Sequence, residues 1–142
     1  MVLHNIKNIF NDITIDGDKL FVKSNIYQVL NFIKNNYHFN LLKEIIAIDN
    51  KDAGIELIYH LYNIEDDENV FISITTKEEI ESVSQIFNSA IADEKEIYDM
   101  FGINFIGHKE LKRLYMPETW QGHPLRKDYV EEDARLNWNE KT

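Results

Sequence analysis

Three runs rich in β-branched and aromatic residues, joined by short turns, constrain the fold most strongly. They cover residues 41–49, 55–63 and 70–76, and the last one reads VFISITT. Such side chains suit the pleated, half-buried surface of a sheet. The connections between the runs are too short for a crossover helix, so neighbouring strands are expected to run antiparallel. Residues 41–76 therefore predict an antiparallel meander of three strands.

The flanking segments predict helices and one more hairpin. Apolar residues recur at helical spacing in 2–10, 25–37 and 78–92. Strands are expected at about 12–16 and 19–23, because Asp16-Gly17 between them is a strong hairpin turn signal. A helix continues or restarts over Asp93–Phe101, and the pattern changes after Gly102. The order helix, two strands, helix, three strands, helix predicts an α+β, two-layer sandwich with a mostly antiparallel sheet.

The last part of the chain is expected to be a long irregular arm. Pro117 and Pro124, with two nearby glycines, forbid a long helix there. We therefore divide the chain into a core at 1–101 and an extended arm with a polar tail at 102–142, within one domain overall.

Composition excludes several classes of function. The formal net charge of −10 argues against nonspecific nucleic-acid binding and against electrostatic adsorption to an anionic membrane. The chain has no cysteine, which excludes thiolate catalysis and iron–sulfur clusters held by its own cysteines, and which suits a reducing cytoplasm. The longest apolar runs are a few residues, so no segment is expected to enter the bilayer, and no signal peptide is evident.

Residues with reactive side chains concentrate between 93 and 128. Glu94, Glu96 and Asp99 follow Asp93 in a helix-like segment, where they form either a solvated face or a divalent-cation site. His108 and His123 could join Asp99 at a metal, although histidines beside glycine and proline more often shape a loop by bonding backbone carbonyls. No serine lies in a G-x-S-x-G context, so nucleophilic catalysis is unsupported.

The arm is also the one locally cationic part of this acidic sequence. Its Lys and Arg residues suit either a phosphate or carboxylate ligand, or ion pairs within and between chains. Its aromatic and apolar groups must be buried by something, either the core of this domain or a partner. Tryptophan, tyrosine and arginine together are typical of interface anchors. The arm residues that support these interpretations are Phe105, Lys109, Lys112, Arg113, Tyr115, Met116, Trp120, Leu125, Arg126 and Lys127.

These motifs resemble the 30 kDa subunit family of respiratory complex I, the NADH:quinone oxidoreductase. The resemblance rests on EKEIYDMFGI at 94–103 and GHPLRKDY at 122–129, with weaker matches between 55 and 94. The family also includes related subunits of energy-converting nickel–iron hydrogenases and formate hydrogenlyases. The chain departs from the family pattern at Asn88, Ala92, Lys95 and Lys109.

The resemblance implies a non-redox accessory subunit of a membrane-associated electron-transfer complex, with no catalytic site of its own. It would lie on the cytoplasmic face and clamp the large catalytic subunit, which is similar to the hydrogenase large subunit, beside a small iron–sulfur subunit. It would bind no cofactor itself, while the parent complex would hold iron–sulfur clusters with NADH and quinone, or a nickel–iron centre. The expected partner-binding residues are Glu94, Glu96, Asp99, Phe101, Gly102, His108, Arg113, Pro117, Trp120, Gly122, His123, Pro124, Leu125, Arg126, Lys127 and Asp128.

Two other functions remain open from the residues alone. The first is a stand-alone metal- or anion-binding protein, which requires Asp99, His108, His123 and Arg126 to converge on one pocket. The second is a stand-alone interaction module without an electron-transfer partner.

Overall fold

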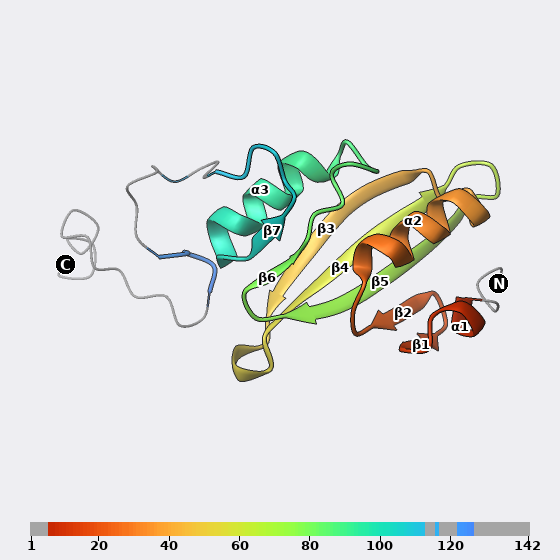
Figure 1. Cartoon of the computed structure of the whole chain (residues 1–142), viewed down its shortest axis with the longest axis horizontal. Helices are drawn as coiled ribbons and strands as arrows, with labels where there is room; N and C mark the ends of the chain where they lie inside the picture. Colours follow the sequence, from red (N-terminus) through yellow and green to blue (C-terminus); the bar gives the residue numbers. More distant parts are fainter. Residues whose placement is uncertain (1–5, 113–115, 117–121, 127–142) are drawn as a thin grey trace.

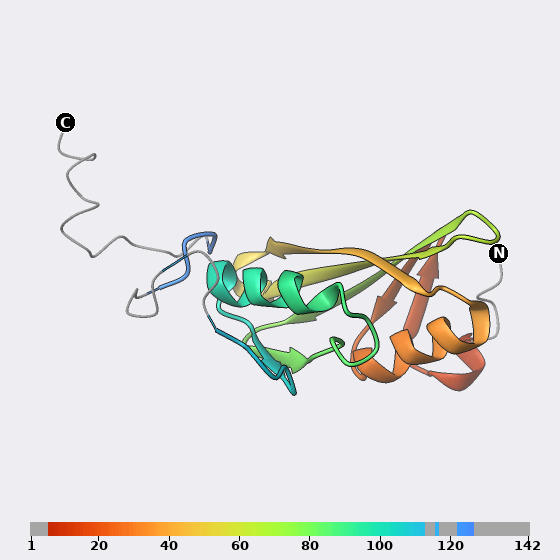
Figure 2. The same ribbon diagram turned by 90° about the horizontal axis from the view of Figure 1, so that it is seen from above.

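A five-stranded sheet with helices on one face forms the framework of the computed structural model, which describes residues 6–112, 116 and 122–126 (Figures 1 and 2). The strand order is β1-β2-β5-β4-β3. The sheet strands are β1 (Ile13–Asp16), β2 (Lys19–Val22), β3 (Leu41–Asp49), β4 (Ile55–Asn63) and β5 (Glu68–Thr76). This mostly antiparallel sheet with helices confirms the predicted fold class.

The predicted meander is present as β3, β4 and β5. Its strands pair antiparallel, and Tyr59 in the middle of β4 lies opposite Ile45 on one side and Ile72 on the other. Alternate residues of β4 are buried and half-buried, which shows that one face of the sheet carries the core. A short 3-10 turn, η1 (Lys51–Ala53), joins β3 to β4.

The predicted N-terminal hairpin is also confirmed. β1 and β2 pair antiparallel around Gly17, which has the positive φ of 61° that such a turn requires. β2 then lies parallel to β5, with Leu20 opposite Ile72. This parallel pairing places the hairpin on the same sheet as the meander.

Three helices lie on the core face of the sheet, and Figure 2 shows α2 and α3 on the same side of it. They are α1 (Ile6–Ile9), α2 (Ile26–Tyr37) and α3 (Ala90–Phe101). The predicted helix at 25–37 is confirmed as α2, which buries an apolar stripe including Val29, Leu30 and Ile33. Of the predicted helix at 2–10, α1 keeps four residues, and residues 1–5 lie outside the described part of the chain.

The prediction of a helix over 78–92 is wrong, because α3 begins only at Ala90. The segment instead contains a short strand, β6 (Glu79–Glu81), followed by turns. Ser82 and Ser84 compete with a helix here, since the Ser84 N–H donates to the Ser82 hydroxyl oxygen and the Val83 N–H donates to the Glu94 carboxylate. Val83 and Phe87, whose spacing predicts a helix, are both buried in the core although the segment that carries them is a compact loop.

Residues 104–106, near the start of the predicted irregular arm, form regular structure. A short strand, β7 (Asn104–Ile106), pairs parallel with β6 in a separate two-stranded sheet. Ile103 and Phe105 are buried in the main core. The first residues of the predicted arm therefore contribute to the folded core, and the division at 101/102 stays a prediction. Across the described residues, no helix is both long enough and apolar enough to cross a membrane.

Candidate functional site

The C-terminal end of α3 holds two separate parts of the arm. Gly102 ends the helix with φ 79° and ψ 20°, and its N–H donates to the Tyr98 carbonyl at 2.9 Å. Glycine is the residue that adopts this left-handed conformation without a Cβ penalty. The helix therefore stops at the position predicted from the sequence.

Hydrogen bonds from Met116, His123 and Leu125 tie described parts of the arm to this helix end. The Met116 N–H donates to the Asp99 carboxylate at 2.9 Å. His123 Nδ1 bonds the Asp99 carbonyl at 2.9 Å, and the Leu125 N–H donates to the Met100 carbonyl at 2.9 Å. The last carbonyls of a helix lack partners within the helix, so segment 122–126 satisfies groups that otherwise need water. We call these bonded groups, together with Gly102, the arm anchor.

Gly102 also packs directly against the His123 ring. A Cβ at position 102 would lie 2.6 Å from His123 Cδ2 and 2.9 Å from Nε2. A carbonyl oxygen can only accept, so the bond to the Asp99 carbonyl fixes His123 Nδ1 as a donor. Glycine is thus required at 102 both for its backbone conformation and for space.

The N-terminal half of α3 holds a second polar cluster, around Glu94. This carboxylate is fully buried, accepts from the Ser82 hydroxyl at 2.6 Å and from the Val83 N–H at 2.8 Å, and so connects α3 to the loop after β6. Burial raises the pKa of Glu94 to about 7, although both hydrogen bonds oppose that rise. Burial also raises the pKa of Asp93, whose carboxylate accepts the Ile45 N–H of edge strand β3 at 3.2 Å.

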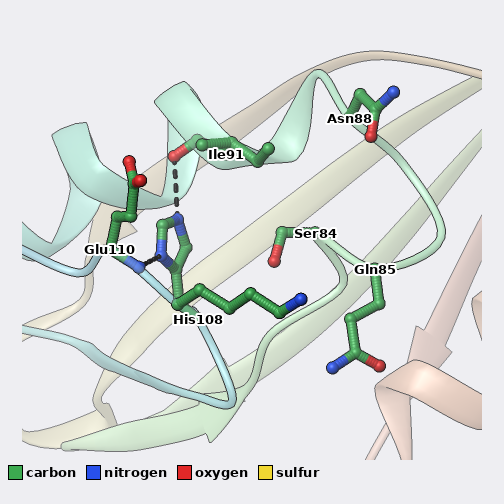
Figure 3. Close-up of a pocket in the computed structure, with 7 residues that line it drawn as sticks. Ser84, Gln85, Asn88, Ile91, His108 and Glu110 are labelled. Carbon is green, nitrogen blue, oxygen red and sulfur yellow. Dashed lines mark hydrogen bonds between the residues drawn. The ribbon is translucent and has the colours of Figure 1, made fainter.

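His108 lies against this second cluster and not at the arm anchor. Its Nε2 bonds the Ile91 carbonyl at 3.0 Å and lies 3.9 Å from Glu94 Oε1. Its Nδ1 accepts the Glu110 N–H at 3.1 Å, so Nε2 carries the proton. His108 also lines a pocket of about 460 Å³ beside α3 (Figure 3).

The metal or anion site proposed from Asp99, His108, His123 and Arg126 does not form. His108 bonds the helix at Ile91 and His123 bonds it at Asp99, eight residues or about 12 Å farther along the axis. No group of three or more His, Asp or Glu side chains within the described ranges could hold a metal ion. The stand-alone binding function therefore loses the geometry on which it depended.

The other predicted partner-binding residues fall into three sets. Glu96, Gly122 and Leu125 are exposed, whereas Phe101, Pro124 and Arg126 are half-buried. Glu94 and Asp99 are fully buried, so in the chain alone they act by holding other segments of this protein. Residues outside the described part of the chain are Arg113, Pro117, Trp120, Lys127 and Asp128. Partner binding by these residues stays a prediction.

The groups that hold the two clusters together could not be predicted from the sequence. Helical spacing over 78–92 predicts Ser82 and Val83 inside a helix, and Met116 stands out only for its side chain, whereas the structure uses its backbone N–H. A serine at 82 with a glutamate twelve positions later carries no motif. The signal that is present is Ser-Val-Ser itself, because closely spaced serines favour loops over helix interiors.

Comparison with known proteins gives the class to which this fold and these clusters belong. The family model described as the 30 kDa subunit of respiratory-chain NADH dehydrogenase matches residues 21–135. The fold is similar to the trypsin-resistant fragment (1–134) of Nqo5, with a TM-score of 0.54 and 25% identity over 70% of this chain and 88% of that one. The chain belongs to the 30 kDa subunit family of respiratory-chain NADH dehydrogenase.

The relatives within this family are components of NADH-quinone oxidoreductases. The chain is 38% identical to the C subunit from Citrifermentans bemidjiense, and the match spans 75% of this chain and 70% of that protein. It is 32% identical to the C subunit from Geobacter metallireducens, over the same two shares. It is also 38% identical to the C/D subunit from Phocaeicola vulgatus, where the match spans 70% of this chain but only 20% of that longer protein.

Proposed function

We propose that this chain is a non-redox subunit of an NADH-quinone oxidoreductase-type complex, and that its arm binds the large catalytic subunit. In this proposal a small iron–sulfur subunit lies nearby and the complex stands on the cytoplasmic face of the membrane. The parent complex supplies the iron–sulfur clusters and the quinone site, and this chain binds no cofactor. Family membership supports the type of complex, since the named relatives are subunits of NADH-quinone oxidoreductases.

The arm anchor is the observation that carries the docking role. The three hydrogen bonds of the arm anchor use backbone groups of Met116 and Leu125 and the imidazole of His123. The Leu125 side chain takes no part in them and is 55% exposed. Segment 122–126 is thus held to α3 through its backbone and the His123 ring, while the apolar Leu125 side chain points outward. Such an arrangement presents a surface for another protein.

Leu125 gives the most direct test of docking by the arm, because its side chain can be removed without affecting the hydrogen bonds of the arm anchor. We expect Leu125→Ala to reduce co-purification with the large subunit while leaving the urea midpoint of the isolated chain unchanged. Arg126→Ala should also reduce co-purification, because a charge left without its partner in an interface costs several kcal/mol, on the order of 2–5.

A matched control is available at the opposite end of the sheet. Ile64 is 69% exposed in the turn between β4 and β5, and this turn lies far from segment 122–126 (Figure 1). Ile64→Ala removes a similar exposed side chain and should leave co-purification unchanged. If Leu125→Ala and Arg126→Ala both retain the large subunit as well as Ile64→Ala does, the arm is not the docking surface.

A further inference from the structure

Glu94 is connected to the pocket by an unbroken chain of hydrogen bonds. Its Oε1 lies 2.6 Å from Ser82 Oγ, and Ser82 Oγ lies 2.7 Å from Ser84 Oγ. Ser84 lines the pocket of about 460 Å³, and Figure 3 shows it facing the same space as His108. The fully buried carboxyl group is therefore two hydroxyl groups away from this space.

The hydroxyl chain can carry a proton in either direction. When Glu94 is ionised, Ser84 donates to Ser82 and Ser82 donates to the carboxylate. When Glu94 is protonated, its O–H donates to Ser82, and Ser82 donates to Ser84. Either serine oxygen can act as the donor in the bond between them, because a hydroxyl group both donates and accepts. In the change from the protonated to the ionised state, the Glu94 proton passes to Ser82, the Ser82 proton to Ser84 and the Ser84 proton to water in the pocket. Three O–H bonds break and three form, with no movement of heavy atoms.

The surroundings favour the protonated form without abolishing the ionised one. From α3, Asp93 adds a negative charge, and from β4 the buried hydroxyl of Tyr59 interacts electrostatically with Glu94. From the turn after β7, His108 presents its Nε2–H at 3.9 Å. Lys109 and Glu110 lie farther out, at the pocket. The other ring nitrogen, His108 Nδ1, accepts the Glu110 N–H and so faces away from Glu94.

We propose that Glu94 is a proton-binding site that exchanges its proton with the adjacent pocket through the hydroxyl groups of Ser82 and Ser84. This proposal goes beyond partner docking, because it concerns a buried group that the arm anchor does not use. The site binds a hydrogen ion, and the pocket provides the water from which it comes. Titration of Glu94 then follows the pH of the solution while the fold stays closed.

The titration of the Glu94 carboxyl carbon, followed by NMR on the full chain, tests this proposal. Glu94→Gln identifies the resonance. We expect a midpoint near pH 7 in the unaltered protein. Ser82→Ala removes the hydroxyl group that bonds the charged carboxylate more strongly than the neutral carboxyl group, so it should raise the midpoint, with a roughly tenfold change in proton affinity. Ser84→Ala keeps that bond but interrupts the path to the pocket, so it should slow the exchange of the Glu94 proton with water, measured from the line shape of the same resonance near the midpoint.

Two further features of the experiment separate an effect on Glu94 from a general effect on the fold. Glu96→Gln makes the same substitution on an exposed position of α3 and should leave the Glu94 midpoint unchanged. Ser84 lies at the pocket, so Ser84→Ala keeps the fold and tests the relay even if Ser82→Ala does not fold. A Glu94 midpoint below about pH 5, the ordinary range of a glutamate, would overturn the proposal. No shift of the midpoint in Ser82→Ala, or unchanged proton exchange in Ser84→Ala, would also overturn it.

Discussion

Substitution of Gly102 by alanine tests the arm anchor most sharply. The new Cβ would lie 2.6 Å from His123 Cδ2, 2.9 Å from Nε2 and 3.0 Å from Cγ. These distances are too short for carbon–carbon and carbon–nitrogen contacts, so the ring must move. It cannot move freely, because its Nδ1 holds the Asp99 carbonyl at 2.9 Å. Gly102→Ala therefore displaces the His123 ring and breaks its bond to the Asp99 carbonyl.

The expected loss of stability has two parts. An alanine held at φ 79° costs roughly 1–2 kcal/mol in the left-handed conformation. The lost hydrogen bond of His123 adds about 1 kcal/mol. Gly17→Ala is the matched control, since Gly17 has φ 61° and no atom within 4 Å of its added Cβ. It carries the backbone cost alone, so the two variants should differ by about 1 kcal/mol.

Urea unfolding and amide hydrogen exchange provide the assay. Gly102→Ala should accelerate exchange of the Leu125 N–H, which is bonded to the Met100 carbonyl, and should leave exchange in β4 and β5 close to that of Gly17→Ala. His123→Ala removes the ring that the new methyl group meets. The double variant Gly102→Ala/His123→Ala should therefore lose less stability than the sum of the two single variants.

Either of two results would contradict this role of the His123 contact. Equal losses of stability in Gly102→Ala and Gly17→Ala would show that the His123 contact carries no energy. Strict additivity in the double variant, with unchanged exchange at Leu125, would show that segment 122–126 is not held by this helix end in solution.

Two further predictions concern buried polar groups. The Tyr59 hydroxyl is fully buried and has no hydrogen-bond partner among the described residues. Tyr59→Phe should therefore leave the free energy of unfolding unchanged or raise it, by up to about 1 kcal/mol, in a urea titration. As a control, Tyr62→Phe loses a 2.7 Å bond to Asp67 and should lower the free energy of unfolding slightly. The pKa of Glu94 is raised from 4.5 to about 7, so between these pH values the folded state binds more protons than the unfolded state. The unaltered protein should therefore lose stability relative to Glu94→Gln as the pH rises through this window. This rise in pKa corresponds to at most about 3 kcal/mol, and a flat difference between the two proteins across the window from pH 4.5 to about 7 would contradict it.

The main sheet could be predicted from the sequence because its pattern is local. Runs of β-branched residues, and the Asp16-Gly17 turn, determine strand and turn within a few residues of themselves. The partner of β2 could not be predicted in the same way. Nothing near residues 19–22 indicates that they pair with 71–74, because the two segments are about fifty residues apart in the chain.

The helix predicted over 78–92 shows why apolar spacing alone misleads. Val83 and Phe87 are four residues apart and both are buried, as in a helix, yet the backbone between them is a turn. The deciding interaction is the Glu94 carboxylate, which accepts the Val83 N–H from a helix that begins seven residues later. A contact between side chain and backbone across a loop leaves no periodic trace in the sequence.

The candidate site could be predicted in part. The acidic helix and its end at Gly102 follow from local signals, namely the helical spacing and the glycine. The separate roles of the three carboxylates could not be predicted, because nothing in the sequence distinguishes Glu94, Glu96 and Asp99. Only their positions on α3 leave Glu96 exposed, make Glu94 a partner of the loop after β6, and make Asp99 a partner of Met116.

The parallel pairing of β2 with β5 has a consequence for the order in which the chain folds. Leu20 and Ile72 are more than fifty residues apart, whereas the strands of the meander are joined by short turns. Closing a long loop costs conformational entropy before any contact is gained, so local pairings form sooner. The hairpin of β1 and β2 is therefore expected to join a sheet whose other three strands have already formed. Sequence changes in that hairpin should then speed unfolding more than they slow folding.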